Sequence, residues 1–152
     1  MKPVVIFSAF LLAASPFAGA VDLNKDAMKA MQQQGQNIVD EAQDGRHYRA
    51  AGDFCLDSKN GALVVNKCSD KTDSQKWKMD DKSRLLAHNG QCVADTKLAK
   101  CGSGKDQKWK QDDKMRLVNQ TQKCLEVPGK SAKAGTLVIT TACSNSKGQV
   151  WK

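Results

Sequence analysis

Most of the chain carries its apolar residues in runs too short for the helices of a globular domain. Runs of two or three leucine or β-branched residues lie at 63–65, 85–86, 117–118 and 137–139. The turn sequences Asn60-Gly61, Asn89-Gly90 and Pro128-Gly129 fall between them. Dense short strands joined by turns, with no helical period, predict an all-β barrel or sandwich from residue 46 onward.

Residues 21–45 follow a different pattern, with apolar or small side chains three or four positions apart. This spacing predicts an amphipathic helix that Gly45 ends. Its apolar face consists of Leu23, Ala27, Met31, Gln34, Ile38 and Ala42. The face is thin, and Gly35 costs about 1 kcal/mol in a helix interior. We therefore expect the helix to dock on the rest of the chain or on a partner protein; a frayed, solvated leader is the alternative.

The first twenty residues have the three parts of a secretory signal peptide. Lys2 supplies a positive start, residues 4–14 are almost entirely apolar, and Ala18-Gly19-Ala20 offers the small residues of a cleavage site. The apolar run is too short to span a membrane. Residues 1–20 are thus predicted to be removed before Val21, and the protein to be secreted, either outside the cell or into a periplasm.

One ten-residue segment occurs twice, and part of it occurs a third time. The sequence KWKMDDKSRL at 76–85 returns as KWKQDDKMRL at 108–117, identical at eight of ten positions. Gln stands two positions before each tryptophan of the chain, in Gln75-x-Trp77, Gln107-x-Trp109 and Gln149-x-Trp151. Such a period predicts one structural unit used three times, over about 46–83, 84–115 and 116–152. Trp77, Trp109 and Trp151 are expected to pack in a shared core.

The six cysteines fall two to a unit. In an exported chain of this size they suggest disulfides, for which fifteen pairings exist in principle. Equivalent pairs in equivalent units favour Cys55–Cys68, Cys92–Cys101 and Cys124–Cys143. Metal ligation is the weaker alternative, because the chain has no Cys-x-x-Cys pair and only two histidines. No metal and no cofactor is predicted.

Charge divides the chain into two parts. Residues 21–45 hold two lysines against five acids, a net of −3, whereas residues 46–152 hold 21 Lys and Arg against 11 acids, a net of +10. Such asymmetry favours anionic partners, and for an exported protein these are acidic glycans, lipopolysaccharide, phospholipid or an acidic protein rather than nucleic acid. Simple solubility is the alternative explanation. Asp80-Asp81 and Asp112-Asp113 are attributed to turns rather than to acid–base catalysis.

The triple arrangement of a Cys-apolar step, a second cysteine and Gln-x-Trp resembles the ricin B-chain-type lectin β-trefoil. The resemblance covers residues 46–152. It implies a β-trefoil of three disulfide-closed repeats, preceded here by the amphipathic helix, and a carbohydrate-binding function.

In that family a sugar site uses an Asp two positions after the first cysteine and an aromatic residue two before the second. It also uses a polar residue two before the aromatic one and an Asn before the Gln of Gln-x-Trp. The corresponding residues here are Asp57, Asn66, Val64 and Ser74 in unit one, Ala94, Ala99, Lys97 and Asp106 in unit two, and Glu126, Thr141, Ile139 and Gly148 in unit three. No unit keeps the set. The best candidate site is Asp57, Asn66 and Gln75, with Glu126 and Gln149 as the candidates in unit three.

Two functions remain open from the sequence. The first is a secreted, non-enzymatic lectin-like module that binds acidic glycan or envelope polysaccharide through its basic surface. The second is a scaffold or targeting subunit of a secreted, toxin-type assembly, in which residues 22–45 dock a protein partner. An autonomous enzyme ranks below both, because the helix and the trefoil frame use nearly every residue of the mature chain.

Overall fold

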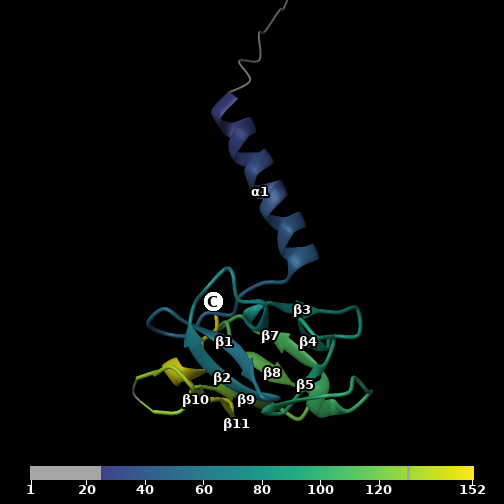
Figure 1. Ribbon diagram of the computed structural model, residues 1–152, viewed down its shortest axis with the longest axis vertical. Coiled ribbons are helices and arrows are strands. Elements are labelled where there is room, and N and C mark those ends of the chain that lie inside the picture. The colour runs from purple at the N-terminus through teal and green to yellow at the C-terminus, as the bar shows by residue number, and fades with distance from the viewer. Residues whose placement is uncertain (1–24, 130) are drawn as a thin grey trace, which may run out of the picture.

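The computed structural model describes residues 25–129 and 131–152. A single α-helix, α1 (Lys25–Asp44), stands on a β-trefoil built of short strands (Figure 1). The predicted signal peptide, residues 1–20, and the start of the predicted apolar face at Leu23 lie outside the described residues.

The trefoil strands are two to six residues long, as the short apolar runs predict. They are β1 (Phe54–Lys59), β2 (Ala62–Lys67), β3 (Trp77–Met79), β4 (Leu85–Ala87), β5 (Cys92–Ala94), β6 (Lys97–Ala99), β7 (Trp109–Gln111), β8 (Leu117–Asn119), β9 (Lys123–Glu126), β10 (Thr136–Leu137) and β11 (Ile139–Ala142). A 3₁₀ turn ends on the Gln of each Gln-x-Trp step, at η1 (Asp73–Gln75), η2 (Lys105–Gln107) and η3 (Lys147–Gln149).

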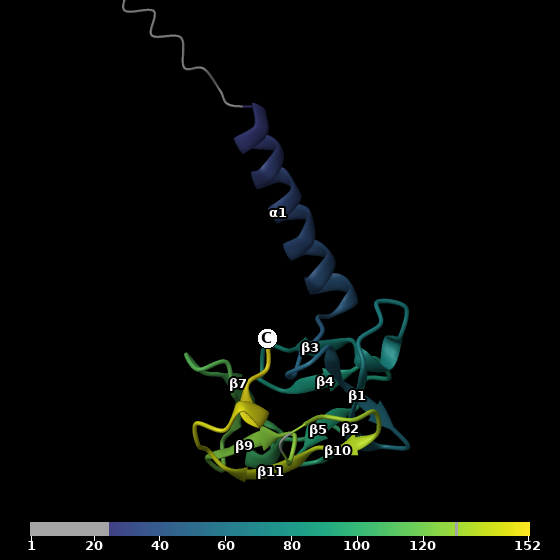
Figure 2. The same cartoon turned by 90° about the vertical axis from the view of Figure 1, so that its left-hand side faces the viewer.

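The strands form two antiparallel sheets. One has the order β1-β2-β6-β5-β4-β3, with β10 also paired to β2, and the other has the order β11-β9-β8-β7. The β1–β2 hairpin is the longest pair and turns at Asn60 and Gly61, whose φ angles of 52° and 78° suit a tight hairpin turn. Because β10 comes from unit three, its pairing with β2 joins the end of the trefoil to its beginning (Figure 2).

Each tryptophan makes the same hydrogen bond across its own unit. The indole N–H donates to the carbonyl of the residue that follows the first cysteine: Trp77 to Leu56 at 2.9 Å, Trp109 to Val93 at 3.0 Å and Trp151 to Leu125 at 3.0 Å. All three rings are at most 2% exposed, which confirms their predicted place in the core. A buried indole N–H requires such a partner, so the ring and the carbonyl position each other.

Each glutamine of the Gln-x-Trp step holds the second cysteine of its unit from both sides. The Gln75 amide donates to the carbonyl of Lys67 and accepts from the N–H of Ser69, and these two residues flank Cys68. Gln107 bonds the neighbours of Cys101 in this way, and Gln149 those of Cys143. The predicted disulfides Cys55–Cys68, Cys92–Cys101 and Cys124–Cys143 are all confirmed.

The helix projects away from the trefoil (Figures 1 and 2). Over residues 25–36 it does not dock there, because every side chain in this range is exposed. Its end is fixed instead. Gly45 has a φ angle of +88°, and a Cβ there would lie 3.1 Å from the backbone of Trp77. Arg46 then pairs with Trp77 through two backbone hydrogen bonds. The predicted end of the helix at Gly45 is therefore confirmed, and only one residue separates the helix from the trefoil.

Reduction of the three disulfides should unfold the trefoil near room temperature. Each bridge contributes roughly 2–4 kcal/mol, and a domain of this size has a total stability of about 5–15 kcal/mol. Thermal melting followed by near-ultraviolet circular dichroism, with and without strong reductant, checks this. An unchanged midpoint in reductant would show that the core holds without its bridges.

Candidate functional site

The unit-one candidates come together as the sequence predicts. Asp57 on β1 accepts hydrogen bonds from Asn66 Nδ2 of β2 at 2.9 Å and from Gln75 Nε2 of η1 at 3.1 Å. The carboxylate is nevertheless closed to solvent, because Asp57 is only 5% exposed. Asn66 is also engaged, since its Oδ1 accepts from the Gly135 N–H of unit three.

Donors already surround the Asp57 carboxylate. Besides Asn66 and Gln75, the Ser58 N–H lies 2.7 Å from Oδ1, and the Ser74 side chain also bonds the carboxyl group. Burial alone would raise the pKa of Asp57, but hydrogen bonds from Ser74, Asn66, Gln75 and Ser58 outweigh it and hold the pKa below the usual 3.8. A carboxylate offers about four acceptor positions, so four donors leave little for a ligand.

Unit two has no carboxylate at the corresponding position. Ala94 stands there and is 6% exposed. The side chain of Gln107 is occupied by the backbone around Cys101. Unit two therefore offers no sugar-type cluster at this place.

Unit three keeps a carboxylate that is more open. Glu126 on β9 is partly exposed and accepts from Gln149 Nε2 at 2.7 Å and from Ser146 Oγ at 2.9 Å. These two donors leave about two of its acceptor positions free. A Cβ at Gly148 would clash with the Val127 carbonyl, so this position accepts no side chain unless the backbone shifts.

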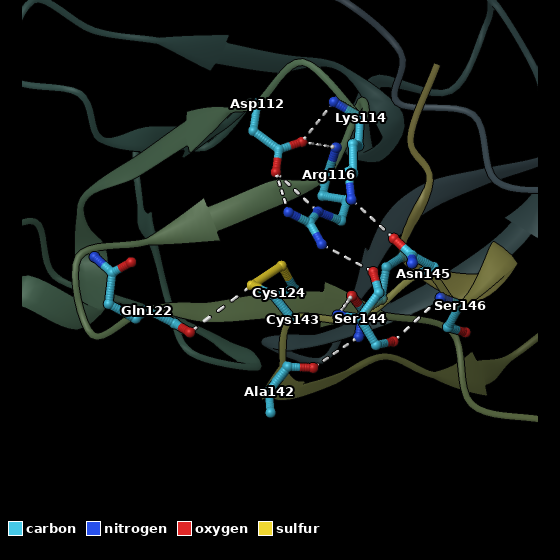
Figure 3. Close-up of polar contacts among 11 residues, drawn as sticks. Asp112, Lys114, Arg116, Gln122, Cys124, Ala142, Cys143, Ser144, Asn145 and Ser146 are labelled. Carbon is cyan, nitrogen blue, oxygen red and sulfur yellow. Dashed lines mark hydrogen bonds and ion pairs between the residues drawn. A yellow bond between two sulfur atoms is a disulfide. The ribbon is translucent and has the colours of Figure 1, made fainter.

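A chain of polar contacts runs from the turn at Asp112 to the segment of Ser144, Asn145 and Ser146 (Figure 3). Asp112 forms an ion pair with Arg116, whose other guanidinium nitrogen donates to the Ser144 carbonyl at 2.9 Å. Lys114 Nζ donates to Asn145 Oδ1 at 2.9 Å. The Ser144 N–H in turn donates to Gln149 Oε1, so the turn at Asp112 holds the segment that presents Ser146 and Gln149 to Glu126.

Two neighbouring cavities lie beside the unit-three cluster, where the first residues of the trefoil meet its last. The smaller, of about 270 Å³, is lined by Ala50, Ala51, Val127, Gly129, Ser131, Ala132, Ser146, Lys147 and Gly148. The larger, of about 370 Å³, shares Ala50, Ala51 and Lys147 with it and adds Arg49, Gly52, Asp53, Val150 and Lys152. Sequence reasoning missed Ser146 and Lys147. Ser146 stands three positions before the Gln of Gln-x-Trp, and this offset could have drawn attention to it.

All five aromatic rings of the described residues belong to the core or pack against it. Tyr48 is 2% exposed and lies under the Arg46 guanidinium at 4.7 Å, and Phe54 packs on the core from its edge. The three tryptophans complete the set. In residues 25–129 and 131–152 no ring is exposed as a stacking platform for a sugar would be, since even Phe54 is half-buried.

Comparison with known proteins gives the family. The model of the ricin-type β-trefoil lectin domain matches residues 49–151. The chain belongs to the ricin-type β-trefoil lectin family. The predicted fold class is therefore confirmed, and the protein carries a carbohydrate-binding module of this type.

Solved structures similar to this lectin domain share its fold at low sequence identity. The agglutinin from Abrus precatorius has a TM-score of 0.64 at 11% identity, with 70% of this chain and 44% of that chain covered. The designed three-fold symmetric ThreeFoil has 0.58 at 22%, covering 70% and 95%. The β-trefoil lectin of the Vibrio vulnificus hemolysin/cytolysin, with N-acetyl-D-lactosamine bound, has 0.56 at 21%, covering 70% and 90%. This chain thus spans under half of the Abrus chain. No curated protein matches its sequence.

Over residues 25–129 and 131–152, no three His, Cys, Asp or Glu side chains gather so as to hold a metal ion. The one helix described, α1, is not apolar enough to cross a membrane.

The lectin domain should lose stability as the pH falls below 3.8. Hydrogen bonds and ion pairs from Arg84 and Arg116 outweigh burial and lower the pKa of Asp80 and Asp112, as the bonds around Asp57 do for that group. A carboxyl group whose folded pKa is depressed stabilises the fold above its unfolded value of 3.8 and loses this contribution as the pH falls through the folded value. Melting temperature against pH measures the effect.

Asp112→Asn should cost about 1 kcal/mol at neutral pH, because it removes the Arg116 ion pair, and should flatten the acid dependence. Asp113→Asn is the matched control, since Asp113 is the exposed neighbour in the same turn. Equal effects of the two substitutions would contradict the role given to Asp112.

Proposed function

We propose that this protein is a secreted, non-enzymatic carbohydrate-binding module whose ligand is an acidic glycan or envelope polysaccharide, lipopolysaccharide included. Membership of the lectin family supports the carbohydrate-binding part. The net charge of +10 over residues 46–152 supports an acidic ligand, because a surplus of cations attracts polyanions at long range. The predicted signal peptide and the three disulfides support export.

The observation that carries this proposal is that none of the five aromatic rings of the described residues is exposed: four lie in the core, and Phe54 is half-buried against it. A neutral sugar is held largely by stacking its apolar face on an exposed ring, and the described part of this trefoil has no such ring. Binding must then depend on hydrogen bonds and charge. An acidic saccharide supplies both kinds of partner, because its carboxylate or sulfate meets lysine and arginine while its hydroxyl groups meet acceptors.

We place the site in unit three, at Glu126. Its carboxylate is partly exposed, is oriented by Gln149 and Ser146, and retains free acceptor positions for sugar hydroxyls. Lys147 lines both adjoining cavities and can meet an acidic substituent. Asp57, Asn66 and Gln75 instead stabilise unit one, because the Asp57 carboxylate is buried and fully hydrogen-bonded.

A scaffold or targeting subunit of a toxin-type assembly is the second candidate. The exposed helix α1 favours it, since Met31 is 70% exposed and available to a protein partner. Similarity to the lectin of the Vibrio vulnificus hemolysin/cytolysin agrees with such a role. In this case the protein would co-purify from its source with a second polypeptide and would bind no glycan.

Binding to immobilised neutral, uronic-acid, sulfated and lipopolysaccharide glycans tests the first candidate. We expect selective binding to the acidic ligands that weakens as salt is added, because screening shortens the reach of the charges. Glu126→Gln should lower affinity about tenfold, equivalent to ~1.4 kcal/mol, without lowering the melting temperature by more than a few degrees.

Lys147→Gln should weaken binding to acidic ligands, whereas Lys97→Gln should not. Lys97 is the matched control because it is an exposed lysine on β6 and does not line either cavity beside unit three. Equal losses from both substitutions would assign binding to the diffuse charge of the surface. Salt-insensitive binding to neutral galactosides alone would contradict the acidic-ligand proposal.

A further inference from the structure

The first half of α1 exposes an apolar face that nothing in the described structure covers. Met28 is 53% exposed and Met31 is 70% exposed. Gly35 lies on the same side at helical spacing, and a Cβ built there would meet no atom within 4 Å. A single amphipathic helix of 20 residues has only marginal stability in water. It therefore stays helical only if another surface covers its apolar face.

The junction at Gly45 prevents α1 from folding back onto the trefoil, so the trefoil cannot cover its apolar face. Gly45 needs its positive φ angle of +88°, and its backbone packs against that of Trp77. Arg46 is already hydrogen-bonded to Trp77. With one residue between helix and trefoil, no linker exists to fold α1 back, so the described part of the chain cannot cover the apolar face.

The spacing along the helix matches pairing with a second helix. Met28, Met31 and Gly35 follow one another at intervals of three and four residues, and the sequence continues these intervals to positions 38 and 42. Alternating intervals of three and four are the period of a two-helix seam. A glycine within the seam lets two helices approach closely and leaves room for a methionine from the partner.

The charges along α1 select the orientation of that partner. Residues 25–34 hold Lys25, Lys29 and Asp26, a net of +1, while residues 35–44 hold three acids and no base, a net of −3. The acids crowd the C-terminal end, where the helix dipole is itself negative, and the last turn has no basic residue. A parallel copy would bring −3 against −3, whereas an antiparallel copy brings +1 against −3.

We propose that α1 joins two copies of this protein as an antiparallel helix pair through the face of Met28, Met31 and Gly35. A helix of 20 residues is about 30 Å long at 1.5 Å per residue. The pair therefore holds the two basic trefoils at opposite ends, several Debye lengths apart at physiological salt. If the proposed glycan binding also holds, the dimer presents two sites and gains avidity on a repeating polysaccharide.

Sedimentation equilibrium of the purified protein, with far-ultraviolet circular dichroism at the same concentrations, tests this inference without any glycan. We expect the mass to rise from monomer to dimer with concentration, and the helical signal to rise with it. Met31→Glu should leave a monomer of reduced helicity and an unchanged trefoil melting temperature. Gln33→Glu adds the same charge away from the seam and should leave the dimer intact.

The salt dependence of dimerisation distinguishes an antiparallel from a parallel helix pair. Association should weaken as salt is added if opposite charges meet in an antiparallel pair, and should strengthen if like charges meet in a parallel one. A monomer with full helicity at every concentration would overturn the inference, as would a dimer that Met31→Glu leaves unchanged. A monomer that gains helicity only on phospholipid vesicles or with a second protein would overturn it in favour of that occupant. Loss of glycan binding would leave the result untouched.

Discussion

The structure depends on one hydrogen bond made three times, from a tryptophan indole to the carbonyl beside the first cysteine of its unit. The bond joins residues 21, 16 and 26 positions apart in the three units, and each time it fixes a large ring in the core. Two residues earlier, a glutamine amide fixes the backbone on both sides of the second cysteine. The Gln-x-Trp step thus holds the backbone next to both cysteines of each unit.

Everything between these fixed points is free to vary in length. The disulfide loops close 13, 9 and 19 positions, yet the three bridges have the same Cα–Cα distance of 4.9 Å. The longest loop belongs to unit three, whose strand β10 pairs with β2 and whose Gly135 closes over Asn66. Variation in unit three therefore decides how open the neighbouring unit-one cluster is, as well as its own.

The small supply of aromatic residues links the fold to the proposed chemistry. All five aromatic rings of the described residues lie in the core or pack against it. Ligand recognition must therefore use polar and charged side chains. Glu126 retains unused acceptor positions, and lysine and arginine line the cavities beside it. An acidic saccharide is the class of ligand that such a surface suits best.

The repeat made much of this fold predictable from sequence. Equivalent positions of Cys and Trp gave the disulfides and the core, because symmetry copies local contacts from unit to unit. The closure of Asp57 could not be foreseen, since it depends on Ser74 and on packing around Asn66. Ser146 was not predicted because it lies outside the positions that the family's sugar site uses, and its hydrogen bond to Glu126 depends on the fold of unit three.

The sequence also could not predict the direction in which α1 leaves the trefoil. The sequence predicted the end of the helix at Gly45, but the contact of Gly45 with the Trp77 backbone is a product of tertiary packing. Of the two expected docking sites for the helix, the trefoil and a partner protein, the trefoil is not used over residues 25–36, which are exposed. The exposed face of α1 therefore has to be explained by contact with a second molecule rather than by the fold of the trefoil.

Hydrogen exchange of the three indole N–H groups, followed by nuclear magnetic resonance, tests the central claim most directly. If the Gln-x-Trp frame holds the trefoil as one unit, Trp77, Trp109 and Trp151 should exchange slowly, at a common rate set by global unfolding. Fast exchange of any one indole, or three widely different rates, would show that the units open independently and that the frame does not carry the fold.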